Sequence, residues 1–429
     1  MRRLLVVSPR FPPVNAPDMQ RVRISLPHFA DSGWEPYVLA VDPEGVEGVV
    51  EPLLLETVPR DVPIRRVRPV PQRWTRRVGV GDLGLRSFWA LYRAGCDIIR
   101  RHGIDLAYFS TTVFTALPLG RLWKRRLGIP FVVDLQDPWV SDYYEGRAKN
   151  ERPPKYRLAR AMHAVLEPWT MPEAAGLVAV TPEYIDTLQT RYPRLRDVPH
   201  DVIPMGASEA DFDLVGRLNL PSPFFQPGDG HVHGVYAGVL GPVMRPTCRA
   251  LCAALRMGLD RWPALFSRVR LHFIGTDYDP AAPRATMLPL AEEIGVREFV
   301  HEEPARAPYF TAIQTLLDAD FLLLVGSDNP QYTASKLYPY ILARRPLLAI
   351  FHEKSAVVDV LGRTGAGEIV TFADGFEPSE LAEEVVERWR LLLERLPFQP
   401  DTNWAEFEPY LAGASTRRQC ALFDRVATA

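Results

Sequence analysis

Cysteine is scarce in this chain. Four of its 429 residues are cysteines, and the only close pair, Cys248 and Cys252, has the i, i+4 spacing of a helix and not the C-x-x-C of a zinc or redox site. So few thiols exclude a disulfide-stapled scaffold and favour a reducing cytoplasm. The nine histidines show no H-x-x-x-H spacing, so zinc is not indicated, and we expect neither a metal nor a resident cofactor.

Long hydrophobic runs are also absent. The opening apolar run, residues 4–7, stops at Ser8-Pro9 and is too short for the core of a signal peptide. No uncharged apolar stretch reaches the roughly 18 residues that a membrane-spanning helix needs. The formal net charge is −2, which excludes a strong electrostatic argument for nucleic acid. We therefore expect a cytoplasmic protein without a nucleic-acid partner.

Lysine is scarce among the basic residues. Of the 50 lysines and arginines, only five are lysines, at positions 124, 149, 155, 336 and 354. A lysine in a polar loop therefore stands out as a candidate for a specific role.

What the sequence does contain is a repeated alternation of short apolar runs with helical patterns. Runs that predict buried strands lie at residues 4–7, 37–41, 106–110, 131–135, 175–180 and 201–204, and again at 235–238, 269–274, 299–301, 321–325 and 347–351. This alternation predicts an α/β fold of two doubly wound, Rossmann-like domains facing a central cleft. A stretch rich in proline and glycine, residues 204–230, predicts the crossing between domains of residues 1–205 and 206–400.

The segment from Tyr332 to Ala343 carries the clearest chemical pattern. It follows the apolar run 321–325 and a polar loop, and it predicts a helix that starts near Ser335, with this serine as the cap. A helix N-terminus attracts phosphate through free N–H groups and a partial positive charge. Ser335 and Lys336 would add a hydroxyl donor and a full charge, which predicts a diphosphate site. The alternative is a plain cap and a solvated lysine.

Glycines follow the predicted strand at 235–238. Gly238 and Gly241 would let backbone amides approach a phosphate closely, and Arg245 would pair with the same anion. The spacing is not that of G-x-G-x-x-G, so an ordinary turn is the alternative.

Polar residues in the first half mark a second candidate site. Asp134 and Asp137 lie at the carboxyl end of the predicted strand 131–135, where an active-site base would lie. For Asp134 a structural carboxylate that holds a loop is the favoured reading. Arg10, Arg21 and Arg23 follow the first strand and would meet an acceptor or an anion; a solvated arginine face is the alternative.

The order of these segments resembles the GT-B glycosyltransferases, and within them the retaining group 1, or family 4, class. The segments that carry the resemblance are the proline-rich opening loop and residues 131–139, 178–181, 202–206, 236–238 and 335–340. The resemblance implies transfer of a sugar from a nucleoside diphosphate sugar to a hydroxyl, without a metal, in polysaccharide, glycolipid or glycoconjugate synthesis. The donor would bind in the C-terminal half and the acceptor in the N-terminal half, where Asp137 would orient the acceptor or assist its deprotonation.

The sequence departs from this family at its paired-glutamate motif. The two positions, which in the family meet the transferred sugar and the ribose, correspond here to Gln331 and Pro339. We expect Gln331, Tyr332 and Thr333 to lie near the donor sugar or ribose. We expect the base to be recognised by backbone contacts near His301 and Glu302. The departures keep two alternatives open: a GT-B sugar-nucleotide epimerase, and a non-catalytic relative that binds a sugar or a partner protein.

The resemblance also implies that a helical tail, residues 401–429, crosses back onto the first domain. Its apolar positions suit packing there: Trp404, Phe407, Leu411, Leu422 and Phe423. Two D-x-D patterns, at residues 277–279 and 318–320, resemble the metal-binding pair of another transferase architecture, and we interpret both as structural.

A basic, aromatic segment lies in the first half. From Arg60 to Arg101 there are eleven arginines and three acids, a local net charge of +8, with Trp74, Phe88, Trp89 and Tyr92 interleaved. A face of this kind can lie on an anionic bilayer, which predicts peripheral contact with the inner face of a membrane. The alternative is a solvated helix pair whose aromatic rings face the core.

Overall fold

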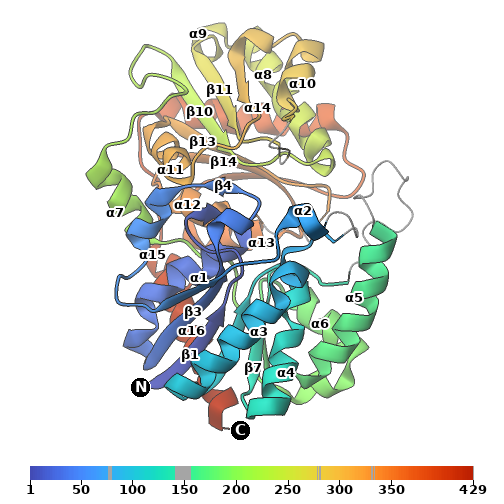
Figure 1. Cartoon of the computed structure of the whole chain (residues 1–429). Helices are drawn as coiled ribbons and strands as arrows, with labels where there is room; N and C mark the ends of the chain where they lie inside the picture. The colour runs from blue at the N-terminus through green and yellow to red at the C-terminus, as the bar shows by residue number, and fades with distance from the viewer. Residues whose placement is uncertain are drawn as a thin grey trace. The chain divides into compact units, whose positions relative to one another are not determined.

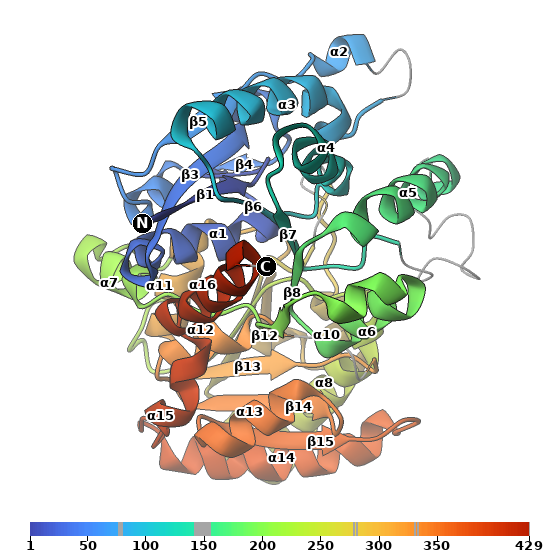
Figure 2. The same cartoon turned by 90° about the horizontal axis from the view of Figure 1, so that it is seen from below.

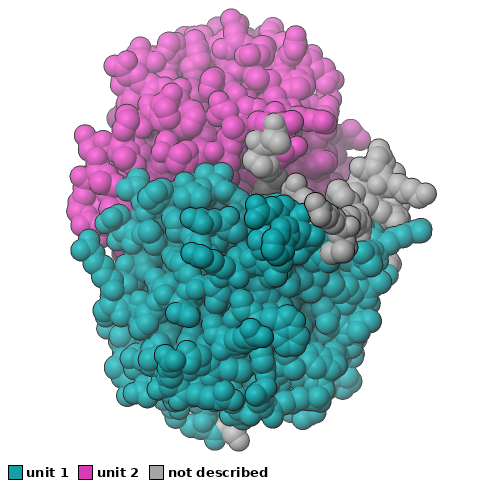
Figure 3. All heavy atoms as spheres, viewed as in Figure 1, with its two compact units in different colours: residues 1–206, 412–429 teal, residues 207–411 magenta. Residues whose placement is uncertain are grey.

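The chain folds as two compact units. A computed structural model describes every residue except 76–79, 141–155, 278, 280–281, 330–331, 333 and 429. Unit 1 comprises residues 1–206 and 412–429, and unit 2 comprises residues 207–411 (Figure 3). The chain thus passes from unit 1 into unit 2 after Gly206 and returns at Ala412.

Unit 1 is built on a seven-stranded sheet in the order β5-β3-β1-β6-β7-β8-β9. Figure 1 labels β1, β3 and β7 of this sheet. The strands are β1 (Arg2–Val7), β3 (Trp34–Val41), β5 (Ile64–Val67), β6 (Leu106–Ser110), β7 (Phe131–Leu135), β8 (Gly176–Ala179) and β9 (His200–Val202). All their pairings are parallel, so their carboxyl ends share one edge of the sheet. Residues 4–7 of β1 are fully buried, as expected of a strand covered on both faces.

The helices of unit 1 start where local capping chemistry permits. They are α1 (Gln20–Ser25), α2 (Gln72–Thr75), α3 (Leu83–His102), α4 (Pro118–Leu127), α5 (Tyr156–Thr170) and α6 (Pro182–Arg191). In α3 the side chain of Asp82 accepts a hydrogen bond from Leu85 N at 2.9 Å. The sequence favours a helix from Phe114, but α4 begins at Pro118, because proline is best tolerated in the first helical turn.

The last helix, α16 (Ala412–Thr428), belongs to unit 1 and runs beside α1 (Figure 2). Its Leu422 and Phe423 are fully buried. The ring of Phe423 lies 4.9 Å from that of Tyr108 on β6 and 5.7 Å from that of Trp34 on β3. This helix therefore covers one face of the sheet.

The first part of the predicted tail packs elsewhere. Helix α15 (Trp404–Phe407) lies in unit 2, where Phe407 is fully buried in the core and Leu411 packs against it. The expectation that Trp404, Phe407 and Leu411 pack on the first domain was therefore wrong. Sequence shows that these positions are apolar, but not which of two similar apolar cores receives them.

Unit 2 repeats the architecture with six parallel strands in the order β12-β11-β10-β13-β14-β15. They are β10 (Val232–Ala237), β11 (Val269–Ile274), β12 (Val300–Glu303), β13 (Phe321–Val325), β14 (Leu347–His352) and β15 (Glu368–Phe372). The helices of eight or more residues are α7 (Glu209–Leu218), α8 (Arg245–Arg261), α10 (Met287–Ile294), α11 (Tyr309–Asp318), α13 (Ala356–Thr364) and α14 (Pro378–Arg395). Both units are parallel α/β layers, so the predicted fold class is confirmed.

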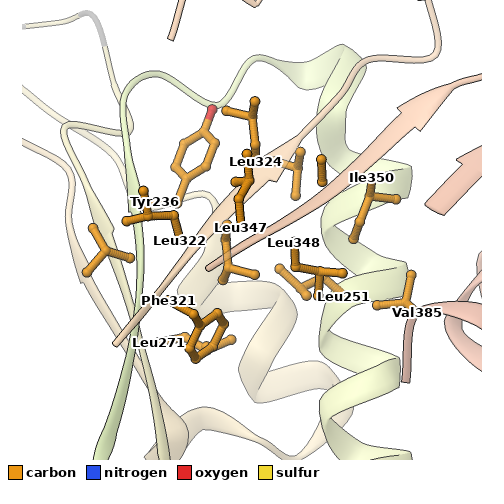
Figure 4. Close-up of a cluster of buried hydrophobic side chains, with 14 of the residues drawn as sticks. Tyr236, Leu251, Leu271, Phe321, Leu322, Leu324, Leu347, Leu348, Ile350 and Val385 are labelled. Atoms are coloured by element: carbon orange, nitrogen blue, oxygen red, sulfur yellow. The ribbon is translucent and has the colours of Figure 1, made fainter. Parts of the chain in front are cut away.

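The core of unit 2 lies between this sheet and helices α8 and α14. Leu251 of α8 and Val385 of α14 are fully buried with strand residues such as Leu322 and Leu348 (Figure 4). Tyr236 of β10 belongs to the same cluster, and its hydroxyl donates to Val239 O at 2.9 Å. The core therefore anchors the loop that follows β10.

Candidate functional site

The loop after β10 can only be formed by a glycine at position 238. Gly238 has a φ of +137°, which side chains rarely adopt. A Cβ there would lie 2.3 Å from Cε of Lys336 and 2.6 Å from its Nζ. The glycine thus lets the lysine rest directly on the loop backbone. The structure thus brings together the two segments that the sequence singled out for a diphosphate, and their role in binding stays a prediction.

The ammonium of Lys336 is held by oxygen atoms at the end of β10. Its Nζ donates to the Tyr236 hydroxyl at 2.5 Å and to Val239 O at 3.1 Å, and it lies 4.4 Å from the centre of the Tyr236 ring. Burial lowers the pKa of this lysine to about 7. Among the described residues no carboxylate forms an ion pair with Lys336. The site therefore has a cation without a counter-charge.

The helix at this site starts later than predicted. Ser335 is exposed and lies in a turn, whereas α12 (Leu337–Leu342) has Lys336 at its cap position and no side-chain cap. The carbonyl of Ser335 would need the N–H of Pro339 to start a helix, and proline has none. The first helical bond is therefore from Tyr340 N to Lys336 O, at 3.2 Å. Ser335 as a helix cap was wrong, and a short helix of six residues follows.

The remaining predicted donor residues have the following places in unit 2. Gly241 precedes a short 3₁₀ turn, and Arg245 is the exposed first residue of α8, whose N-terminus has no side-chain cap. Tyr332 is half-buried, with its ring 6.5 Å from that of Phe351. Gln331 and Thr333 lie outside the described residues.

Sequence reasoning missed two tyrosines that shape this site. The buried Tyr340 hydroxyl accepts from Ala237 N at 2.7 Å, which ties α12 to the last residue of β10. Tyr236 supplies the ring and the hydroxyl on which Lys336 rests. Both looked like core aromatics in the sequence, since only their hydroxyl groups carry a polar signal.

The side chain of Glu302 has a structural role, whereas base recognition by backbone contacts near His301 and Glu302 stays a prediction. The carboxylate of Glu302 accepts from Met287 N at 2.9 Å and from Leu288 N at 2.8 Å, so it caps the start of α10. It also accepts from Thr276 Oγ1 at 2.6 Å and from Thr286 N at 2.8 Å. All four contacts are structural. His301 is exposed on β12, and its role stays a prediction.

In unit 1, Asp134 and Arg21 face one another in the interior. The Arg21 Nε atom lies 2.9 Å from Asp134 Oδ2, and the two side chains are 2% and 0% exposed. Arg21 also donates to Ile203 O at 2.7 Å, and Ser110 donates to Asp134 at 2.7 Å. This is the structural carboxylate that the sequence favoured for Asp134. Neither side chain presents a free group to an acceptor here.

Arg23 is likewise engaged inside the unit. It is fully buried and donates to Gln20 Oε1 at 2.9 Å and to Thr57 Oγ1 at 2.7 Å. The alternative of a solvated arginine face was therefore wrong for Arg21 and Arg23. Their helix, α1, turns them inward.

Arg10 and Asp18 form a second polar group at the ends of β1 and β6. The buried Asp18 carboxylate accepts from Thr111 Oγ1 at 2.8 Å and from Thr112 N at 3.1 Å. Arg10 Nη1 lies 3.5 Å from Asp18 Oδ1, and the arginine side chain is 34% exposed. Arg10 is thus the one predicted acceptor-side arginine with an accessible surface.

Asp137 follows β7 and is exposed. Partial loss of water around the Asp137 carboxyl and the negative charge of Asp18 raise the pKa of this group. Hydrogen bonds fix the loop that contains Asp137. The buried Glu167 of α5 accepts from Val140 N at 2.9 Å and from Arg191 Nη1 at 2.7 Å. Asp137 is therefore an accessible carboxylate on a braced loop. Its catalytic role stays a prediction.

The two D-x-D patterns show no shared geometry for a cation. Asp320 accepts from His233 N at 2.7 Å, and Asp318 accepts from Gln314 Nε2 at 2.9 Å. Asp277 accepts from Arg284 N at 2.7 Å, and Tyr278 lies outside the described residues. Across the part of the chain that the structure describes, no group of three His, Cys, Asp or Glu side chains is arranged to hold a metal.

Comparison with known proteins points to one family. Residues 21–206 match the family model of a glycosyl transferase 4-like domain. No curated protein sequence matches the chain.

Solved structures resemble the whole chain. Trehalose-phosphate synthase from Burkholderia vietnamiensis is 14% identical with a TM-score of 0.58, and the match covers 100% of both chains. Sucrose-phosphate synthase from Thermosynechococcus elongatus is 12% identical with a TM-score of 0.54, covering 100% of this chain and 97% of that one. HepE from Anabaena, in complex with UDP and glucose, is 16% identical with a TM-score of 0.50 over the same shares.

The predicted resemblance to the GT-B glycosyltransferases is thus confirmed at the level of the fold. Residues 21–206 match the glycosyl transferase 4-like model, and the whole chain has the fold of these solved structures.

Proposed function

We propose that this protein transfers a sugar from a nucleoside diphosphate sugar to a hydroxyl acceptor. Unit 2 would bind the donor and unit 1 the acceptor. The observation that carries the proposal is the ammonium of Lys336, which lies on the Gly238 loop without a carboxylate partner among the described residues. A half-buried ammonium on a glycine loop suits a diphosphate, because the negative charge of the ligand would stabilise the protonated form that burial disfavours.

The leaving diphosphate explains why these groups would be useful. As the bond from the sugar C1 to the phosphate oxygen breaks, negative charge develops on the diphosphate. Lys336, Arg245 and the backbone amides from Gly238 to Gly241 would stabilise that charge, with Ser335 as a further donor. We propose that no metal is needed and that configuration is retained, with the leaving phosphate accepting the proton of the attacking hydroxyl.

On the acceptor side, Asp137 and Arg10 are the accessible candidates. The raised pKa of Asp137 moves this carboxyl toward the range in which a group can both hold and accept a proton. We propose that Asp137 orients the acceptor hydroxyl and that Arg10 binds a polar or anionic part of the acceptor. Arg21, Arg23 and Asp134 would act on the acceptor only through the shape of the loops that they hold.

The test of the donor site is nucleotide binding. UDP, GDP and ADP are screened by thermal shift, since a ligand that binds only the native state raises its melting temperature. We expect one of them to bind, and Lys336→Ala to weaken it at least tenfold, while Lys354→Ala, an exposed lysine of the same unit, leaves it unchanged. Wild-type affinity in Lys336→Ala would overturn the phosphate assignment.

A turnover assay separates transfer from the alternatives. A glycosyltransferase is expected to release free sugar slowly from its donor when no acceptor is present. An epimerase would change the sugar configuration while the nucleotide sugar stays intact. Binding without either reaction would favour a non-catalytic sugar-binding relative. The replacement of the paired glutamates by Gln331 and Pro339 is the observation that favours this alternative.

A further inference from the structure

The outer face of α3 carries exposed aromatic and aliphatic side chains. Trp89 is 66% exposed, and on the neighbouring α2 Trp74 is 64% exposed. Leu85 on α3 and Val70 before α2 are also exposed, and the Val70 amide donates to Arg86 O at 2.9 Å, which places the two segments side by side. Leu85 and Trp89 lie one turn apart on the same side of α3, and exposed apolar side chains that adjoin one another mark contact surfaces.

Only part of the aromatic segment faces the core. Phe88 and Tyr92 pack against the core of unit 1, whereas Trp74 and Trp89 do not. The Trp89 ring meets the rings of Phe88 and Tyr92 edge-on, at centroid distances of 5.6 Å and 5.9 Å. The alternative in which all four aromatic rings face the core is therefore wrong.

Arginines border this face around a pocket of about 470 Å³ between α3 and α4. Its lining includes Trp89, Tyr92, Arg93, Arg100 and Arg126. Arg126 donates to the Tyr92 hydroxyl at 3.1 Å, but neither Arg93 nor Arg100 forms an ion pair or hydrogen bond with another described residue. The only acid of the lining, Asp97, pairs with Arg101 at 2.8 Å. The pocket therefore has an excess of positive charge.

We infer that this face docks on an anionic bilayer, with lipid phosphate groups against Arg93 and Arg100 and with Trp89 at the level of the headgroups. Tryptophan favours the membrane–water interface, because its ring is apolar and its N–H still meets water. Each arginine near an anionic surface strengthens binding several-fold. Arg93 and Arg100 form no ion pair with another described residue, so binding to a lipid phosphate would not require them to break one. None of the helices that the structure describes combines the length and the apolar character of a membrane span.

The test is co-sedimentation with lipid vesicles, which does not depend on any sugar donor. The vesicles are an equimolar mixture of phosphatidylglycerol and phosphatidylcholine, or phosphatidylcholine alone. We expect binding to the anionic vesicles at 50 mM salt, much weaker binding at 300 mM salt because exposed charges are then screened, and none to neutral vesicles.

Two matched variants locate the contact. Arg93→Gln with Arg100→Gln should weaken vesicle binding about 30-fold, at about fivefold for each arginine. Arg217→Gln with Arg284→Gln removes the same charge from exposed positions of unit 2 and should change it less than twofold. Trp89→Ser should reduce the binding that persists at higher salt.

Several results would overturn the inference. These are no sedimentation with anionic vesicles at low salt, an equal loss in both double variants, or displacement of the protein from vesicles by millimolar glycerol phosphate, which would indicate a site for a free phosphate. Self-association lost on Trp89→Ser in place of vesicle binding would indicate a protein interface. Donor binding is unaffected by any of these outcomes, so this inference and the proposed function fail independently.

Discussion

At the scale of single residues, the donor site depends on a glycine and a lysine that are distant in sequence. Lys336 can rest on Val239 O and the Tyr236 hydroxyl only because Gly238 lacks a side chain. The positive φ of Gly238 is a second reason why this position needs a glycine. Two independent constraints thus act at one position.

We expect Gly238→Ala to disturb both the site and the fold. The added Cβ would overlap Lys336, and the φ of +137° would be strained, which together cost about 1–3 kcal/mol. Urea unfolding should show that loss, and nucleotide binding should fall with it. Gly241→Ala is the control, because its Cβ would meet only Val243 Cγ2 at 3.8 Å. Equal behaviour of the two variants would contradict the account.

The lowered pKa of Lys336 predicts a proton linkage. The folded lysine loses its proton near pH 7, whereas the unfolded chain keeps it to about 10.5. Between these values the unfolded state binds more protons, so this group makes stability rise with pH. A bound diphosphate favours the charged form, and nucleotide binding at pH 8 should therefore take up close to one proton. Titration calorimetry in buffers of different ionisation enthalpy measures this uptake, which Lys336→Met should abolish. No uptake by the wild type would contradict it.

At the scale of secondary-structure elements, buried polar groups join helices to the sheets. The Arg21–Asp134 pair links α1 to β7, and Glu302 on β12 receives the first N–H groups of α10. Such carboxylates resemble catalytic groups in a sequence, because they too stand at or beside strand ends. Their burial and their contacts with groups of the same unit identify them as structural.

Glu302→Gln should destabilise unit 2. The amide keeps one accepting oxygen but turns an NH₂ group toward backbone donors, which leaves buried groups unpaired at about 1–3 kcal/mol. Glu298→Gln changes the same charge at an exposed position nearby and should be neutral. Chemical denaturation compares the two. A neutral Glu302→Gln with weakened nucleotide binding would instead restore Glu302 as a binding residue.

At the scale of the whole molecule, the chain closes unit 1 with its last helix. The sheet of unit 1 is made by residues 1–206, yet α16 covers part of it after the chain has formed unit 2. Phe423 is fully buried against Phe29, Trp34 and Tyr108. Unit 1 therefore includes a helix, α16, that follows unit 2 in the sequence.

Phe423→Ala should lower the stability of unit 1 by about 3–5 kcal/mol, since it removes a buried ring and leaves a cavity. Leu391→Ala, at a 45% exposed position of α14, is the control and should cost much less. Thermal unfolding monitored by calorimetry would detect an earlier transition in Phe423→Ala only. An unchanged transition would show that α16 adds little to unit 1.

The amino-acid sequence by itself determined the two parallel α/β units, because apolar runs and helical periods are local properties of the chain. It also singled out Gly238, Lys336 and Asp137, since glycine after a strand and isolated charges are visible in sequence. Only the tertiary structure decided that Lys336 rests on the Gly238 loop, that the helix containing Pro339 begins at Leu337, and that Arg21 and Asp134 form an ion pair with each other. These outcomes depend on which distant groups meet and on how much water remains around them, and neither is encoded in the spacing of residues along the chain.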